Sequence, residues 1–233
     1  MTITPPVLML VTDPSIPDLD ARLDAAVRGG PVWVQYRNKT ATTEERVDWL
    51  LGFRERHPNT CLLVNEDVAA VERSGADGVH LSALSSHPGN VWACTPRHAR
   101  TILGDDAVVG RSAHPENLIE PSAFGSELDY IVFGTVFPSE SHPGSACTGV
   151  KGLHFACVEA KLRGRGLPIL AIGGITPENA GECIRAGAAG VAVVRSVLLA
   201  EDPEQAVAGI FGSMRALAEG NGEIGRRYED HGE

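Results

Sequence analysis

The stretch "PILAIGGITPENAGECIRAGAAGVAVVRS", residues 168–196, contains the alternation that decides the fold. Its first apolar run, 168–174, predicts a strand buried on both faces, because the apolar residues are continuous rather than alternating. Thr176, followed by a proline, predicts the start of a helix over 177–187. A second apolar run at 190–194 predicts the next strand. A strand, a helix and another strand in this order predict one unit of a parallel sheet.

The same alternation extends over most of the 233 residues. Apolar runs predict eight strands, at about 7–12, 32–36, 61–65, 78–81, 107–112, 129–134, 168–174 and 190–194. Helices are predicted at about 17–29, 42–56, 66–75, 95–103, 115–124, 151–165, 177–187 and 203–219. Eight such units predict a single-domain α/β protein, a (β/α)₈ TIM barrel over 1–219, with an open doubly wound sheet as the alternative. We expect the polar segment 220–233 to be a disordered tail.

The amino-acid composition limits the classes of molecule that the protein is expected to bind. A net charge of −10 argues against a broad surface for nucleic acid or for an anionic membrane. Since no window holds about 18 uninterrupted apolar residues, no membrane span is expected. The five cysteines are odd in number and contain no Cys-x-x-Cys pair, which fits the reducing cytoplasm and argues against a disulfide framework or a structural zinc site. We therefore expect a cytoplasmic protein that acts on small molecules.

Polar residues gather where the predicted strands end. In a barrel, the carboxyl ends of all strands face one mouth, where active sites lie. The candidate residues at these ends are Gln35, Arg37, Lys39, Asn65, Glu66, His80, Ser112, His114, Thr135, Ser139, Ser141, His142, Gly173, Gly174, Arg195 and Ser196. Backbone N–H groups after the last two strands are the usual phosphate cradle of such barrels, so we predict that Gly173, Gly174, Arg195 and Ser196 bind phosphate.

Two charged positions leave alternatives open. Arg37 needs an anionic partner at the barrel mouth, which is either Glu66 or an anionic group of a substrate, such as a carboxylate. Asn65 and Glu66 offer oxygen ligands of the kind that hard cations prefer. Because no second carboxylate ends a neighbouring strand, we predict no metal site.

The stretch "VVGRSAH", residues 108–114, ends in a histidine with two interpretations. His114 either caps the helix expected after this strand or carries a proton in catalysis, since imidazole titrates near neutral pH with a pKa of about 6.5. His80 lies within the apolar run "GVHL", so we expect it to be buried in a core hydrogen bond with no role in the chemistry.

Several stretches in order resemble the thiamine phosphate synthase/TenI family. They are "VQYRNK", "LLVNEDVAAVERSGADGVHL", "VVGRSAH", "DYIVFGTVFPSESHPG" and "PILAIGGITPENAGECIRAGAAGVAVV", and the resemblance runs from about residue 7 to residue 200. It implies a (β/α)₈ barrel that acts on a phosphorylated thiazole in thiamine metabolism. The family contains two chemistries, a synthase that joins a pyrimidine pyrophosphate to the thiazole phosphate and a thiazole tautomerase.

The chain departs from the synthase pattern at three places. The synthase usually has Asn-Asp where this chain has Asn65 and Glu66, and Gly-Gln-Glu-Asp where it has Ser82 to Ser85. Its pyrophosphate loop has Thr-x-Thr-Lys where this chain has Ser139-Glu140-Ser141-His142. A departing pyrophosphate needs positive charge to offset its own. Losing both a magnesium carboxylate and the lysine therefore favours the tautomerase.

The resemblance to the tautomerase rests on "GRSAH" and "FGTVF". It implies that His114 moves one proton to aromatise a carboxylated thiazole phosphate without a cofactor. The substrate-binding residues would be Gln35, Arg37, Lys39, Asn65, Ser112 and Thr135. Two alternatives remain: thiamine phosphate synthase, with Mg²⁺ at Glu66, and a non-catalytic regulator that binds thiazole or thiamine phosphate. The family's barrels often pair, which leaves both a monomer and a homodimer open.

Overall fold

The computed structural model describes residues 4–83, 94–118, 124–139, 146–164 and 166–229. Eight parallel strands close into a barrel in which each strand pairs with its neighbour in the sequence and β8 pairs with β1. The strands are β1 Val7–Val11, β2 Trp33–Tyr36, β3 Cys61–Asn65, β4 Gly78–Leu81, β5 Val108–Ala113, β6 Tyr130–Gly134, β7 Ile169–Ile172 and β8 Gly190–Val193. The predicted TIM barrel is confirmed, and the open sheet is wrong.

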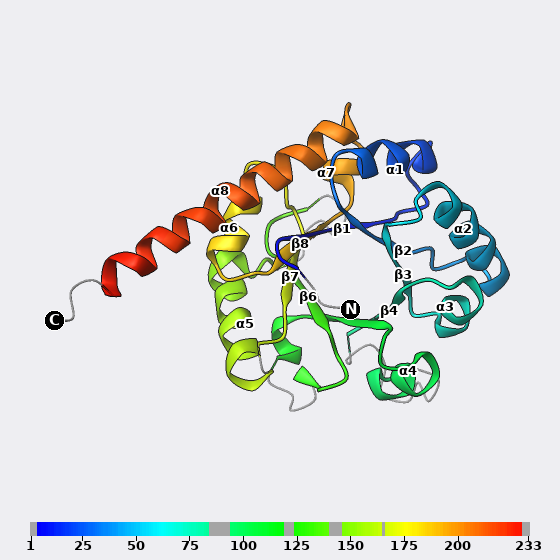
Figure 1. The fold of residues 1–233 in the computed structure, drawn as a ribbon, viewed down its shortest axis with the longest axis horizontal. Helices are drawn as coiled ribbons and strands as arrows, with labels where there is room; N and C mark the ends of the chain where they lie inside the picture. The colour runs from blue at the N-terminus through cyan, green and yellow to red at the C-terminus, as the bar shows by residue number, and fades with distance from the viewer. Residues whose placement is uncertain (1–3, 84–93, 119–123, 140–145, 165, 230–233) are drawn as a thin grey trace.

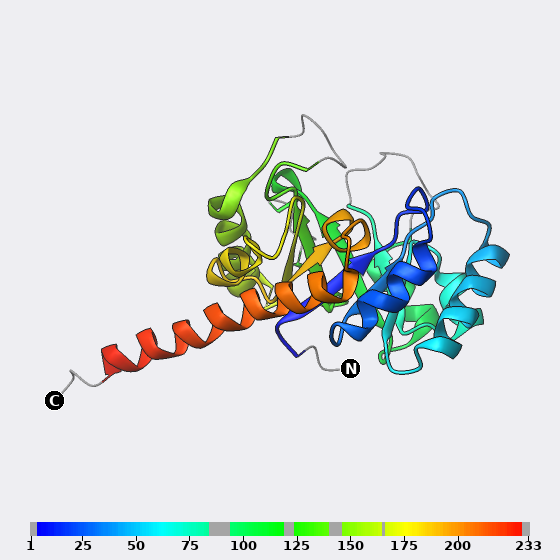
Figure 2. The same cartoon turned by 90° about the horizontal axis from the view of Figure 1, so that it is seen from above.

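Helices surround the barrel (Figure 1). They are α1 Leu19–Arg28, α2 Thr43–Arg56, α3 Val68–Ser74, α4 Pro96–Leu103, α5 Gly149–Arg163, α6 Ala180–Arg185, α7 Arg195–Leu198 and α8 Pro203–Glu229, with a 3₁₀ helix at Pro115–Asn117. The long α8 begins beside α1 and α7, passes α6 and continues away from the barrel (Figure 2). Within the part of the chain described, we find no helix with the length and apolar character needed to span a membrane.

Three helix predictions need correction. The helix expected at 115–124 is a 3₁₀ helix at Pro115–Asn117, and 119–123 lie outside the described residues. The helix expected from residue 177 begins at Ala180, because the side chain of Asn179 closes the preceding turn by accepting from the Thr176 N–H and donating to the Gly174 carbonyl, each at 2.9 Å. The last helix extends beyond 219 to Glu229.

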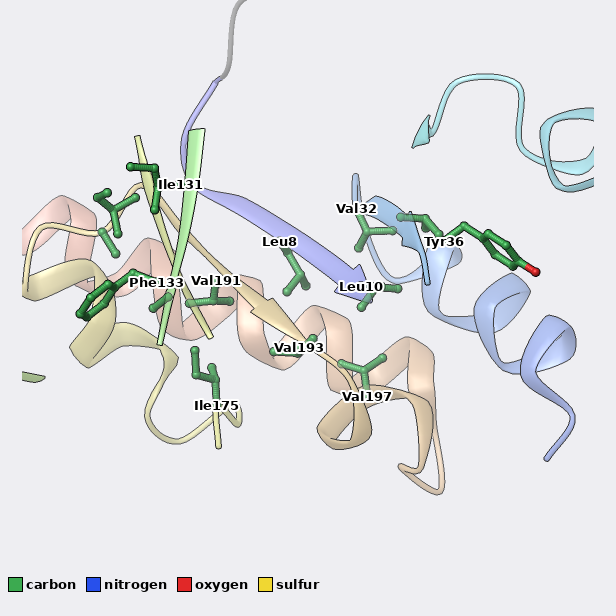
Figure 3. Close-up of a cluster of buried hydrophobic side chains, with 14 of the residues drawn as sticks. Leu8, Leu10, Val32, Tyr36, Ile131, Phe133, Ile175, Val191, Val193 and Val197 are labelled. Carbon is green, nitrogen blue, oxygen red and sulfur yellow. The ribbon is translucent and has the colours of Figure 1, made fainter. Parts of the chain in front are cut away.

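The strands separate two apolar layers, since successive side chains of a strand point to opposite faces. One layer fills the barrel and includes Met9, Trp33, Leu63 and Tyr130. The other lies between the barrel and the helices; Figure 3 shows part of it, with Leu8, Leu10, Val191 and Val193 projecting from β1 and β8. The barrel is thus packed on both faces, which explains the continuous apolar runs in the sequence.

Candidate active site

Neutral polar side chains lie at the carboxyl ends of β2 and β3. Gln35 follows Trp33 by two residues, so both side chains face the barrel interior. The Gln35 amide is buried and donates to Asn65 Oδ1 over 3.1 Å. Two of the predicted site residues are therefore brought together, and each holds the other in place.

Arg37 lies just beyond β2. Thr12, at the end of β1, anchors its backbone: Thr12 Oγ1 accepts from the Arg37 N–H at 2.7 Å and donates to the Arg37 carbonyl at 3.2 Å. The expected alternative of an Arg37–Glu66 ion pair is not formed, and no other ion pair of Arg37 is found among the described residues. The guanidinium charge is therefore available to an anionic ligand. Lys39 is exposed further along the same loop.

Glu66 follows Asn65 at the mouth and has an exposed side chain. Its backbone has φ 61°, which turns the chain out of the strand direction, and its Oε2 accepts from Asn65 Nδ2 over 3.3 Å. Among the described residues, no group of three or more His, Cys, Asp or Glu side chains can hold a metal. The part of the chain that the structure describes therefore offers one carboxylate beside Asn65 rather than a preformed metal cage.

Ser112, on β5, is linked to the barrel interior by a buried histidine. His80 Nε2 lies 2.9 Å from Ser112 Oγ, and His80 Nδ1 lies 2.9 Å from Tyr130 Oη. Burial lowers the pKa of His80 to about 3, with a smaller contribution from the charge of Arg37. His80 is therefore neutral at physiological pH. Its predicted burial in a core hydrogen bond is confirmed.

His114 lies at the rim of the mouth and is exposed. Its Nδ1 is 2.8 Å from the carbonyl oxygen of Gly134, the last residue of β6. The helix that it was expected to cap is not an α-helix. The residue thus links the ends of β5 and β6.

The loops after β6 and β7 pack closely. Gly173 and Gly174 have φ of 102° and 62°, values that favour glycine. A Cβ on Gly173 would lie 2.4 Å from Thr135 Cγ2, and one on Gly174 would lie 2.3 Å from the Pro138 carbonyl oxygen. The two glycines thus let this turn approach Thr135 and the loop after β6, a packing role that we had not predicted.

The remaining predicted residues complete the rim. Arg195 begins the short helix α7, with its Nη2 4.0 Å from Asp13 Oδ2, and Ser196 follows it. The partly buried Ser139 belongs to the described residues, whereas Ser141 and His142 lie outside them. An open pocket of about 460 Å³ is lined by α1, by Trp49 of α2 and by the segments that follow β1 and β2, Arg37 among them.

Sequence reasoning missed Tyr130 and Thr12. Both are buried at strand ends, and Tyr130 was hidden in the apolar run "DYIVFG". Since both faces of this strand are apolar, no alternation marks the residue that points into the barrel. The one signal available was the Tyr130 hydroxyl, a polar group in a strand whose other side chains are apolar.

These features define a single-domain (β/α)₈ barrel with its candidate site at the carboxyl ends of the strands. A family model described as thiamine monophosphate synthase matches residues 8–197. The chain belongs to this family.

Named relatives agree with this assignment. A thiamine-phosphate synthase of Thioalkalivibrio sulfidiphilus is 38% identical over 81% of this chain and 84% of its own length. One from Saccharophagus degradans is 34% identical over 81% and 82%. The solved structure of a thiamine phosphate pyrophosphorylase from Pyrococcus furiosus has a TM-score of 0.73 and 26% identity, and the match covers 91% of this chain and 96% of that one.

The comparisons correct one expectation. The sequence departures favour the thiazole tautomerase, but relatives that are 34–38% identical to this chain are named thiamine-phosphate synthases. The tautomerase interpretation is therefore wrong, and the proton-carrier role of His114 that belonged to it is withdrawn. Similarity over four fifths of the chain outweighs the departures from the synthase pattern at three places.

Proposed function

We propose that this protein is a thiamine-phosphate synthase, which joins a pyrimidine carried on a diphosphate to a thiazole phosphate. The observation that carries the proposal is the 38% identity to a synthase over most of both chains. In this reaction the bond between the pyrimidine methylene carbon and the diphosphate oxygen breaks, and a bond from that carbon to the thiazole nitrogen forms. The diphosphate leaves with the electron pair, so its growing charge must be stabilised.

The side chains around the mouth divide into two proposed groups. Arg37 and Lys39 supply positive charge to the diphosphate, while Gln35, Asn65 and Ser112 supply neutral polar contacts. Support for Arg37 comes from its lack of an ion pair among the described residues and from the two hydrogen bonds between its backbone and Thr12. The thiazole phosphate would bind at Gly173, Gly174, Arg195 and Ser196, with Thr135 beside them.

The residues at the mouth could bind Mg²⁺ in one way, through Glu66 together with the phosphates of the substrate. Mg²⁺ is usually bound by one or two carboxylates together with substrate phosphates, and Glu66 is an exposed carboxylate at the mouth. Glu66 would hold the ion, which when bound offsets the charge of the diphosphate. Because the described residues offer no cage, we expect the ion to bind with the diphosphate rather than alone.

The test is product formation. Purified protein is incubated with hydroxymethylpyrimidine diphosphate, thiazole phosphate and Mg²⁺, and thiamine phosphate and released diphosphate are measured by mass spectrometry. We expect the two products in equal amounts. A protein that binds both substrates and forms neither product contradicts the proposal.

Arg37 provides the first variant for this assay. We expect Arg37→Gln to lower kcat/KM by about 100-fold, because the leaving group loses a charged hydrogen-bond donor. Arg28→Gln is the matched control, since Arg28 ends α1 far from the mouth and forms an exposed ion pair with Glu204. If the two variants have equal kcat/KM values, Arg37 does not stabilise the diphosphate.

A further inference from the structure

Three side chains form a continuous hydrogen-bond chain from the barrel interior to the mouth. Tyr130 is fully buried, His80 is 3% exposed, and Ser112 is partly exposed at the upper end. Both links, Tyr130 Oη to His80 Nδ1 and His80 Nε2 to Ser112 Oγ, measure 2.9 Å. These hydrogen bonds therefore connect the Tyr130 hydroxyl, which no ligand can touch, to the Ser112 hydroxyl, which a ligand can reach.

Strand register and a glycine build this chain. His80 on β4 is paired with Gly110 on β5, which is paired with Tyr130 on β6. A Cβ on Gly110 would lie 1.9 Å from Tyr130 Cζ. The tyrosine ring thus lies across the glycine and reaches His80 two strands away. Ser112 follows Gly110 by two residues and faces the same interior.

The Tyr130 hydroxyl determines which atom donates in each of the two hydrogen bonds. Its Oη has one hydrogen-bond partner among the described residues, His80 Nδ1. Burial raises the pKa of Tyr130 well above its usual value, so the hydroxyl keeps its hydrogen. A buried hydroxyl hydrogen needs an acceptor, and the one within reach is Nδ1. Nδ1 must therefore carry no proton.

The tautomer of His80 is then determined. A neutral imidazole with a bare Nδ1 carries its proton on Nε2, which donates to Ser112 Oγ. The reverse tautomer would leave the Tyr130 hydrogen without a partner in the interior. A buried, unsatisfied donor disfavours that arrangement by about one to two powers of ten.

We infer that His80 and Tyr130 are positioning residues that make the Ser112 hydroxyl a dedicated hydrogen-bond donor to an anionic oxygen of the ligand. Ser112 Oγ accepts from His80, so its own hydrogen points elsewhere, and the mouth is the open direction. No proton is transferred along the chain. His80 does not act as a base toward Ser112, because its proton already lies between the two atoms. The inference rests on the proposed function only where it names the anion as diphosphate.

The direct test is the tautomer of His80, measured by ¹⁵N NMR on protein labelled at histidine. We expect an unprotonated Nδ1 and a protonated Nε2, with the signals assigned by their loss in His80→Gln. A protonated Nδ1 in the wild-type protein overturns the inference. This measurement requires neither substrate nor activity.

The functional test uses Tyr130→Phe, which removes one oxygen atom that no ligand can touch. Without the tyrosine donor the tautomer of His80 is no longer fixed, so Nε2 can also accept from Ser112, and the serine hydrogen is then divided between His80 and the mouth. We expect an affinity for magnesium diphosphate about 10-fold lower, as in Ser112→Ala, by calorimetry. The double variant should show no further loss. Tyr36→Phe is the matched control, because Tyr36 is also buried but faces the helices.

Glutamine at position 80 separates positioning from packing. Its carbonyl can accept from Tyr130 while its amide donates to Ser112, whereas His80→Leu can do neither. We expect His80→Gln to retain most of the diphosphate affinity and His80→Leu to lose it. Equal affinities in the wild-type protein and a folded Tyr130→Phe variant overturn the inference. A wild-type protein with the expected tautomer and diphosphate binding, but without synthase activity, supports the inference and overturns the proposed function.

Discussion

At the scale of single residues, the burial of His80 has a consequence for stability. The folded protein holds its pKa at about 3, whereas an unfolded chain has the ordinary value of about 6.5. The unfolded state therefore binds a proton between these values and the folded state does not. The stabilisation is complete above about pH 6.5 and is lost progressively as the pH falls toward 3.

We expect this loss to be measurable against His80→Gln, which has no titrating group at the same site. Between pH 6.5 and 4.5, the free energy of unfolding of the wild-type protein should fall by up to about 1.4 kcal/mol per pH unit relative to the variant. Urea denaturation at several pH values measures the difference. If the two pH profiles remain parallel, His80 is accessible to protons in the folded state.

At the scale of elements, the pairing of β5 with β6 depends on Gly110. The position has no room for a methyl group because the Tyr130 ring occupies that space. Other strand glycines serve different contacts: a Cβ on Gly78 would meet the backbone of β5, and one on Gly190 the backbone of β1. Gly110 alone of these three makes room for a side chain of the proposed site.

We expect Gly110→Ala to reduce the free energy of unfolding by about 1–3 kcal/mol, the usual range for overpacking a core. In a Tyr130→Leu background the cost should be smaller, because the smaller side chain leaves space. Gly212→Ala is the control, since a Cβ at this exposed position of α8 would meet nothing within 4 Å, and it should stabilise by about 0.5–1 kcal/mol. Additive costs for Gly110→Ala and Tyr130→Leu would show that the ring is not the obstacle.

Helix boundaries differ in how well the sequence predicts them. The starts of α2 and α4 lie within a residue of the prediction, because Thr42 and Thr95 cap them with their side chains. The start of α6 was placed three residues too early, at Pro177. There the oxygen of Asn179, a later residue in the same turn, satisfies the Thr176 N–H. A Thr-Pro pair is compatible both with a helix that begins at Pro177 and with a turn before a helix that begins at Ala180.

At the scale of the whole molecule, α8 stabilises the barrel with its first half. Its buried side chains that the structure describes are Pro203, Val207, Ile210, Phe211 and Met214. Gly29, at the end of α1, allows close contact, since a Cβ there would lie 2.3 Å from the Glu204 carbonyl oxygen. Beyond this region the helix runs away from the barrel (Figures 1 and 2).

We therefore expect deletion of residues 220–233 to change the free energy of unfolding by less than about 1 kcal/mol, whereas Met214→Ala should cost about 2–5 kcal/mol through the cavity that it leaves. Chemical denaturation of the two proteins at equal concentration makes the comparison. A deletion that costs as much as Met214→Ala would show that the last part of α8 contributes to stability. The division of the chain at residue 219 into barrel and tail stays a prediction until then.

The sequence by itself determined the eight strands and the residues at their ends, because continuous apolar runs are local patterns, whereas the pairing of β1 with β8 that closes the barrel excluded the open sheet. It also predicted that Gln35 and Asn65 lie at one mouth, since parallel strands end on the same side. Only the tertiary structure decided that Tyr130, His80 and Ser112 form one chain. Those residues come from three strands, and their contact depends on register and on the space above Gly110. A hydrogen bond needs positions accurate to a few tenths of an ångström, which only the packed barrel provides.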